Sequence, residues 1–288
     1  MLKHFSDIIF PAFSGDYIRG KRDSVPRYFF AGVEIKEVDN EYVMVGNFIK
    51  ETKYKVVTTV QEGVLASTPA DVPTAPYSRF IVFLKNHRMV LVRNETASPD
   101  TRSFQSTVRD ILNQYVRNAN RERSERDKLP IAIANIVDIP LKDSIADVLK
   151  NVNKVSWFKL RFFPLNNDLD PGPLTQHIRE DMKKVGSKTT NIVFNSPNSK
   201  DGISKMIAES SGLAVASLQI VDNTGEKRRV KEGSFSSTIK IEYEGNIRSN
   251  GDEYLIIQAK KDGIISNVSP ENERLYEQEK EHLKALMS

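Results

Sequence analysis

Lysine and arginine side chains, which can neutralise phosphates, recur in several short segments of this chain. A nucleic-acid backbone is held by several cations that lie on one surface, and each contact releases a condensed counterion. The segments that could supply such contacts lie at 102–121, 183–184 and 227–231. The candidate DNA-binding residues are Arg102, Arg109, Arg117, Arg121, Lys183, Lys184, Lys227, Arg228, Arg229 and Lys231.

The first of these segments has the periodicity of an amphipathic helix. Apolar residues recur at helical spacing from Phe104 to Ala119 after a start signal at 98–101, which predicts the longest helix of the chain. At about 100° per residue, Arg102, Arg109 and Arg117 fall within about 80° of one another, opposite the apolar stripe. Such a stripe could follow a row of phosphates. The tail at 121–128 alternates arginine with carboxylates, which is equally typical of a solvated helix end with ion pairs.

The other two basic segments each admit a functional and a structural interpretation. The cations at 227–231 follow a predicted hairpin turn and have only Glu226 and Glu232 as acidic neighbours. Basic hairpins commonly reach a nucleic-acid backbone, but solvent-facing hairpins are often basic as well. Lys183 and Lys184 end a predicted helix at 174–185, where the helix dipole favours cations without any ligand.

Aromatic residues separate single-stranded from double-stranded targets poorly in this sequence. A base-stacking platform needs aromatic and basic side chains interleaved on one face. Trp157 and Phe158 lie in a strand-like run, where packing in the core is the expected role. Lys159 and Arg161 alternate with apolar residues, which indicates a strand with one wet face.

A metal-dependent nuclease is the alternative function. The segment 252–260 reads as a strand that places Gln258 and Lys260 two residues apart, after upstream Glu242 and Glu244. Nucleases of the restriction type place an acid-x-Lys pair at the end of such a strand, with both side chains near the metal. Here the first position is an amide, and two-residue alternation also explains the pattern as the solvent face of a half-buried strand.

Other catalytic chemistry finds no support in the sequence. There is no P-loop, dinucleotide-binding or nucleophile-elbow motif, and the four histidines match no metal-ligand spacing. We therefore expect no catalytic residue, no cofactor and no metal. Cysteine is absent, no apolar run is long enough to span a membrane, and the first twenty residues lack a signal-peptide pattern. A cytoplasmic location is expected.

Length and pattern predict a mixed α+β fold of two modules. The chain has 288 residues, a net charge of +4 and 28% charged residues. Strands are expected at 28–60, 80–93 and 129–141, and a proline-rich linker at 67–76. We expect the first module at 1–155 and the second at 156–288, the second being an antiparallel-rich sheet with flanking helices. A hairpin turn is predicted at 250–251.

From residue 78 onward the order of elements resembles the A component of the Rex phage-exclusion system of lambdoid prophages. The resemblance is carried by Arg179-Glu180-Asp181-Met182-Lys183-Lys184-Val185 and the following Ile192-Val193-Phe194-Asn195, with similar strings at 145–150 and 80–93. It implies a cytoplasmic, homodimeric antiviral-defence protein that binds double-stranded DNA largely without sequence preference. It also implies a small membrane-protein partner and carries no catalytic residue over. Residues 1–67 match nothing in that family.

Overall fold

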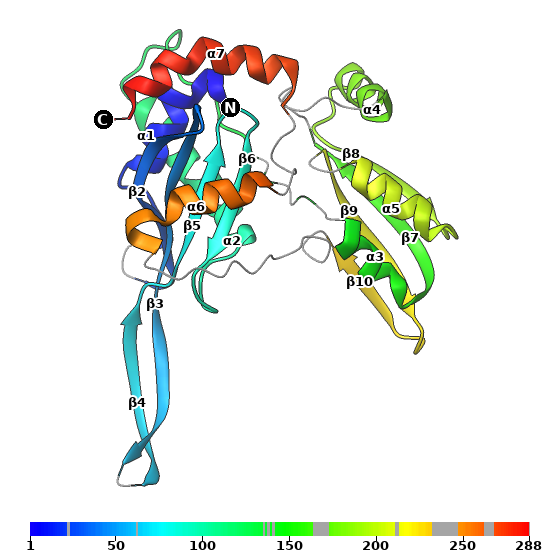
Figure 1. Ribbon diagram of the computed structural model, residues 1–288, viewed down its shortest axis with the longest axis horizontal. Coiled ribbons are helices and arrows are strands. Elements are labelled where there is room, and N and C mark those ends of the chain that lie inside the picture. Colours follow the sequence, from blue (N-terminus) through cyan, green and yellow to red (C-terminus); the bar gives the residue numbers. More distant parts are fainter. Residues whose placement is uncertain are drawn as a thin grey trace. The chain divides into compact units, whose positions relative to one another are not determined.

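The computed structural model of the chain describes residues 1–21, 24–61, 63–134, 136, 139, 142–163, 173–210, 213–231, 247–261 and 268–287. These residues form seven α-helices and two antiparallel sheets, which confirms the mixed α+β fold (Figure 1). The chain divides into unit 1, Met1–Ala134 with Gly245–Ser288, and unit 2, Asn135–Glu244. This division differs from the expected boundary at residue 155, because the strand that begins at Val152 lies wholly in unit 2 and the chain then returns to unit 1.

The sheet of unit 1 has the order β1-β2-β3-β5-β6, and β4 pairs with the outer part of β3. The predicted strands of 28–60 and the predicted hairpin at 80–93 are confirmed. The strands are β1 (Ile18–Arg19), β2 (Arg27–Val38), β3 (Glu41–Gln61), β4 (Val64–Thr74), β5 (Tyr77–Phe83) and β6 (Arg88–Arg93).

The proline-rich segment at 67–76 is not a linker. It lies mostly in β4, which pairs antiparallel with β3 to form a two-stranded ribbon (Figure 1). Proline lacks a backbone donor and is therefore confined to edge strands, and β4 is an edge strand, so its second side needs no donor. The prolines thus mark an edge rather than an end of regular structure.

Five phenylalanine rings hold two helices of unit 1 on its sheet. Ring centroids 4.4–6.4 Å apart join Phe13 of α1 (Phe10–Ser14), Phe104 of α2 (Thr101–Ala119), and Phe30, Phe48 and Phe80 of the sheet. The long helix predicted from the apolar stripe is confirmed, and the side chain of Asp100 caps it by accepting a hydrogen bond from the amide of Ser103. Because its apolar side is buried against the sheet, the opposite side of α2 faces solvent.

The predicted strand at 252–260 is wrong, because this segment belongs to helix α6 (Ile247–Lys261), which also contains the predicted turn at 250–251. Leu255 and Ile256 are buried side by side, and a short apolar run fits a buried helix as well as a strand. Within unit 1, Asp252 fixes the helix to the sheet. Its carboxylate accepts hydrogen bonds from Arg79 Nε at 2.7 Å and from Lys36 Nζ at 2.7 Å.

The last helix, α7 (Pro270–Ala285), begins with a proline and has Glu271 and Glu273 in its first turn. Ser269 caps it by accepting a hydrogen bond from the amide of Asn272. The buried hydroxyl of Tyr276 accepts a hydrogen bond of 2.7 Å from the backbone amide of Tyr42 in β3. Burial raises the pKa of Tyr276 to about 12, so the phenol stays protonated at physiological pH. Within the described ranges, no helix is long and apolar enough to cross a membrane.

Unit 2 is a four-stranded sheet with helices packed on one face. The strand order is β10-β9-β7-β8, with β7 (Val152–Phe162), β8 (Thr190–Asn195), β9 (Ala214–Asp222) and β10 (Lys227–Lys231). Its core joins alternate residues of the strands to buried residues of α3 (Lys142–Lys150), α4 (Pro173–Lys184) and α5 (Lys200–Glu209). The helix predicted at 174–185 is confirmed by α4.

We expect the substitution Asp252→Asn to destabilise unit 1 by about 3 kcal/mol. Removing one partner of a buried ion pair leaves the other charge uncompensated, and Arg79 is only 11% exposed. Burial alone would raise the pKa of Asp252, but hydrogen bonds from Arg79 and Lys36 lower it below its ordinary value. The stabilisation is therefore present above the unfolded pKa and is lost as pH falls through the native pKa.

Urea unfolding of the full chain, followed by circular dichroism at neutral pH and near pH 3, measures this effect. The matched control is Glu253→Gln, which removes a charge from the exposed neighbouring position on the same helix. A neutral-pH deficit for Asp252→Asn no larger than that of the control would contradict the anchoring role of Asp252.

Candidate nucleic-acid interface

Strand β7 separates two sets of side chains by strict alternation. Phe158, Leu160 and Phe162 belong to the core under the helices and are each 1% exposed. Successive residues of a strand point to opposite faces, so Trp157, Lys159 and Arg161 lie on the face of the sheet away from that core. We call this the open face of unit 2.

Strand pairing brings cations from β10 onto the same open face. Trp157 is opposite Gln219 of β9, which in turn is opposite Arg229 of β10. In the next cross-strand row, Lys159 is opposite Ser217, and Ser217 is opposite Lys231. The described residues of the open face are Lys154, Trp157, Lys159, Arg161, Asn191, Val193, Asn195, Val215, Ser217, Gln219, Val221, Lys227, Arg229 and Lys231. This set contains six cations and no carboxylate.

Two arginines on this side of unit 2 lie against aromatic rings. The guanidinium carbon of Arg229 is 5.3 Å from the ring centroid of Trp157, and that of Arg161 is 5.1 Å from the ring of Phe163. Phe163 directly follows β7, and its contact with Arg161 places it at the end of the open face. Aromatic and basic side chains are therefore interleaved along one strand, which is the arrangement that a base-stacking platform needs.

The predicted site residues of unit 2 divide between the two sides of its sheet. Lys227, Arg229 and Lys231 lie on the open face. Arg228 lies opposite Ile220 on the helix side, where its charge adds to the stronger effect of a hydrogen bond from Thr224 in lowering the pKa of Asp222. The prediction that treated 227–231 as one cluster missed this split, because alternation in a strand sends neighbours to opposite faces.

Lys183 and Lys184 are exposed at the end of α4, on the helix side of the sheet. Met182 of the same helix is buried in the core, so these lysines do not join the open face. Lys184 Nζ is 3.0 Å from Asp181 Oδ1, and this hydrogen bond raises the pKa of Lys184. At the C-terminus of the helix these lysines interact favourably with the helix dipole, and they could also form a phosphate contact apart from the open face.

Lys159, Arg161, Trp157 and Phe163 are candidate contacts that were not predicted from the sequence. The alternation of polar and apolar residues along 157–162 did indicate one wet face. Only the pairing of β10 with β9 and of β9 with β7 brings the cations of 227–231 beside them. A packing role for Phe158 is confirmed, since its ring is buried, whereas Trp157 is only partly buried.

Unit 1 carries the second basic surface, the outer side of α2. Arg102, Arg109 and Arg117 are exposed there as predicted, and Arg121 follows just beyond the helix. Arg109 also has a structural contact, because its Nε donates a hydrogen bond of 2.7 Å to the carbonyl of Ala134. The stripe of arginines on the helix is thus present, but Arg109 is already hydrogen-bonded to the backbone of the chain.

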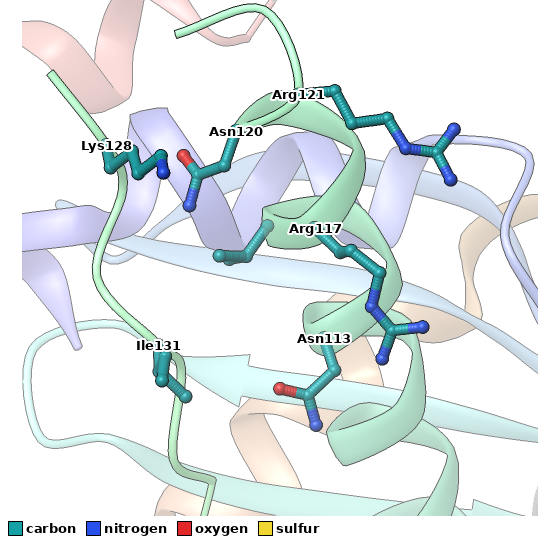
Figure 2. A pocket seen from close by; sticks show the side chains of 7 residues that line it. Asn113, Arg117, Asn120, Arg121, Lys128 and Ile131 are labelled. Carbon is teal, nitrogen blue, oxygen red and sulfur yellow. The ribbon is translucent and has the colours of Figure 1, made fainter. Parts of the chain in front are cut away.

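A pocket of about 430 Å³ lies between α2 and the segment that follows it. Figure 2 shows Lys128 and Ile131 on that segment across from α2, with Arg117 and Arg121 extending from the helix. The lining residues are Asn113, Val116, Arg117, Asn120, Arg121, Lys128 and Ile131. They provide three cations and two amides but no carboxylate, although Lys128 is paired with Glu125 outside this set.

Asn120 holds the segment that closes this pocket. Its amide nitrogen donates to the carbonyl of Leu129 at 2.9 Å, and its carbonyl accepts from the amide of Leu129 at 2.8 Å. Residues 129–134 form no strand, so the described part of the predicted strand at 129–141 is wrong, and most of the rest lies outside the described residues. Ile131 is 80% exposed, which removes the burial that the strand prediction required.

The nuclease alternative gains no support from unit 1. Gln258 and Lys260 lie on helix α6 rather than on a strand, so two-residue alternation does not place them together. Lys260 Nζ contacts Glu41 at 3.1 Å and Asp39 at 3.4 Å. Glu242 and Glu244 lie outside the described residues. Across the described ranges there is no group of three histidine or carboxylate side chains that could hold a metal ion.

We expect Asn120→Ala to release the segment 121–134 from α2. Two hydrogen bonds to Leu129 are lost, each contributing about 0.5–1.5 kcal/mol, so local opening should become about 10- to 100-fold more frequent. Hydrogen exchange at the Leu129 amide measures this opening. Asn118→Ala, at an exposed position of the same helix end, is the control. Equal exchange at Leu129 in wild type and Asn120→Ala would contradict the clamp.

Comparison with known proteins identifies no family for this chain. No protein-family model matches the chain, and no curated protein or solved structure is similar to it. The resemblance to the A component of the Rex system therefore stays a prediction from short strings of sequence.

Proposed function

We propose that this chain is a non-enzymatic DNA-binding protein that holds the phosphate backbone largely without regard to sequence. The observation that carries the proposal is the open face of unit 2, where six cations lie on strands β7 and β10, on either side of β9, with no carboxylate among the described residues of that face. Like charges on one surface repel each other, and a polyanion bound against them would relieve that repulsion. Phosphates are the polyanion that such a surface fits best.

Sequence independence follows from the type of contact. Lysine and arginine on a sheet surface reach phosphate oxygens, which position a nucleic acid but carry no sequence information. The outer side of α2 offers a second set of phosphate contacts in unit 1, with Arg102, Arg117 and Arg121 as its members. Each unit therefore carries a basic surface of its own.

The biological setting is supported by the sequence resemblance alone. That resemblance implies a role in phage exclusion, as a cytoplasmic homodimer that acts with a small membrane-protein partner on double-stranded DNA. Two-fold symmetry would suit a duplex, whose two backbones are related by local two-fold axes. We adopt this setting as part of the proposal.

We expect the double substitution Lys159→Ala with Lys231→Ala to weaken binding to duplex DNA of random sequence. The two lysines flank Ser217 in one cross-strand row, so they can contact neighbouring phosphates. Each phosphate contact adds about −0.9 to the slope of log affinity against log salt, and the double variant should flatten that slope by up to about two units. Fluorescence anisotropy with labelled duplex at several salt concentrations measures the slope.

The matched control is Arg228→Ala with Lys205→Ala, which removes the same charge from the helix side of unit 2. Lys205 pairs with Glu209 on α5, and Arg228 lies opposite Ile220. This control should keep nearly the wild-type slope. An equal loss in both double variants would mean that net charge, and not the open face, governs binding. If the wild type ignores DNA at low salt, the proposed function fails.

We expect the protein to be a homodimer at micromolar concentration. The expectation comes from the symmetry of duplex DNA and from the resemblance to the Rex component. Multi-angle light scattering of the full chain gives the mass directly, against 32.6 kDa for one copy. A mass of one copy across the micromolar range would refute the dimer and leave the phosphate contacts untouched.

A further inference from the structure

We propose that the open face of unit 2 takes single-stranded DNA, with bases stacked on the rings of Trp157 and Phe163 and phosphates held by the cations between them. This inference rests on the proposed DNA-binding function and adds single-stranded DNA to duplex DNA as a ligand of the open face. It concerns the open face alone, because the outer side of α2 presents cations and amides without an exposed ring.

The order of side chains along β7 fits an unpaired strand of nucleotides. Trp157, Lys159, Arg161 and Phe163 follow one another on one face, and alternate residues of a strand are about 6–7 Å apart. An aromatic ring stands at each end of the row and two cations stand between the rings. An extended single strand can likewise present bases and phosphates to the same surface, so rings and cations can be engaged together.

A duplex would leave the rings unused. Its bases are stacked on each other inside the helix, and only their edges and the phosphates face outward. Trp157 lies in the middle of a strand that is paired on both sides, so its ring lies on the surface of the sheet beside the open-face cations. A partly exposed aromatic side chain at such a position can stack on the full face of a base only when that base has left its own stack.

The neighbours of Trp157 suit a base without selecting one. Its cross-strand neighbours are Gln219 and Asn195, whose amides both donate and accept hydrogen bonds. Arg229 lies over the ring, and a base that stacks there would move its guanidinium toward a phosphate. The site therefore fits any base, in keeping with binding that does not depend on sequence.

Trp157 is an intrinsic fluorescent probe of this site, because it is the single tryptophan of the chain. Oligothymidylate of about twenty nucleotides, long enough to cover such a surface, should quench the fluorescence of the full-length protein on binding. A duplex of equal length and random sequence should bind with little quenching. Trp157→Ala should lower the affinity for oligothymidylate by about 5- to 150-fold and change duplex affinity less than about twofold.

Phe163→Ala is the second variant, since it lies just outside the strand and leaves Trp157 in place as the probe. It should weaken oligothymidylate binding while the remaining binding still quenches Trp157. Trp157→Phe should restore most of the affinity that Trp157→Ala loses, because a ring remains. Circular dichroism identifies any variant that fails to fold, and Phe163→Ala then carries the test.

The outcomes separate this inference from the function on which it rests. If oligothymidylate binds without quenching, and Trp157→Ala and Phe163→Ala both bind it like wild type, the stacking inference is overturned. The proposed phosphate binding survives that result if Lys159→Ala with Lys231→Ala still flattens the salt slope. If neither form of DNA binds at low salt, both proposals fail together.

Discussion

The candidate interface depends on the register of strand β7 in its sheet. This strand is paired on both sides, and its buried residues Phe158, Leu160 and Phe162 fill the core under the helices. A slip of one residue would bring two cations into that core and expose three apolar side chains, so the register is strongly determined. The cations of the open face are therefore held by apolar packing on the other side of the sheet, and no attraction among them is required. Electrostatic repulsion on one face is offset by burial on the other.

Periodicity in the sequence was sufficient for elements with one buried and one exposed side. The helix at 101–119 and the strands at 28–60 were predicted because their patterns persist over many residues. The open face could not be predicted, because strand order depends on contacts between distant segments. Lys159 and Arg161 are almost seventy positions from Arg229 in sequence, and only the order β10-β9-β7 brings them together.

The wrong predictions also have identifiable physical causes. The segment around Leu255 has too few apolar residues to distinguish a helix from a strand. In the helix, Asp252 forms a buried contact with Arg79, which is distant in the sequence. The ribbon at 64–74 contains prolines that usually interrupt regular structure, but an edge strand needs donors on one side only. In both cases a contact between segments that are distant in the sequence outweighed the structural propensity of the local residues.

Electrostatics and stacking would cooperate at Trp157 if a base binds there. A cation over an exposed ring contributes about 0.5–1 kcal/mol, whereas stacking of a base on an aromatic side chain contributes about 1–3 kcal/mol. A base can therefore replace Arg229 on the ring, 5.3 Å away, at a net gain. The displaced guanidinium remains on the same face, beside Lys231 and Lys159, and becomes available to a phosphate. Arg229 would shield the ring in the absence of DNA and add a phosphate contact in its presence, so that one residue links the two modes of binding.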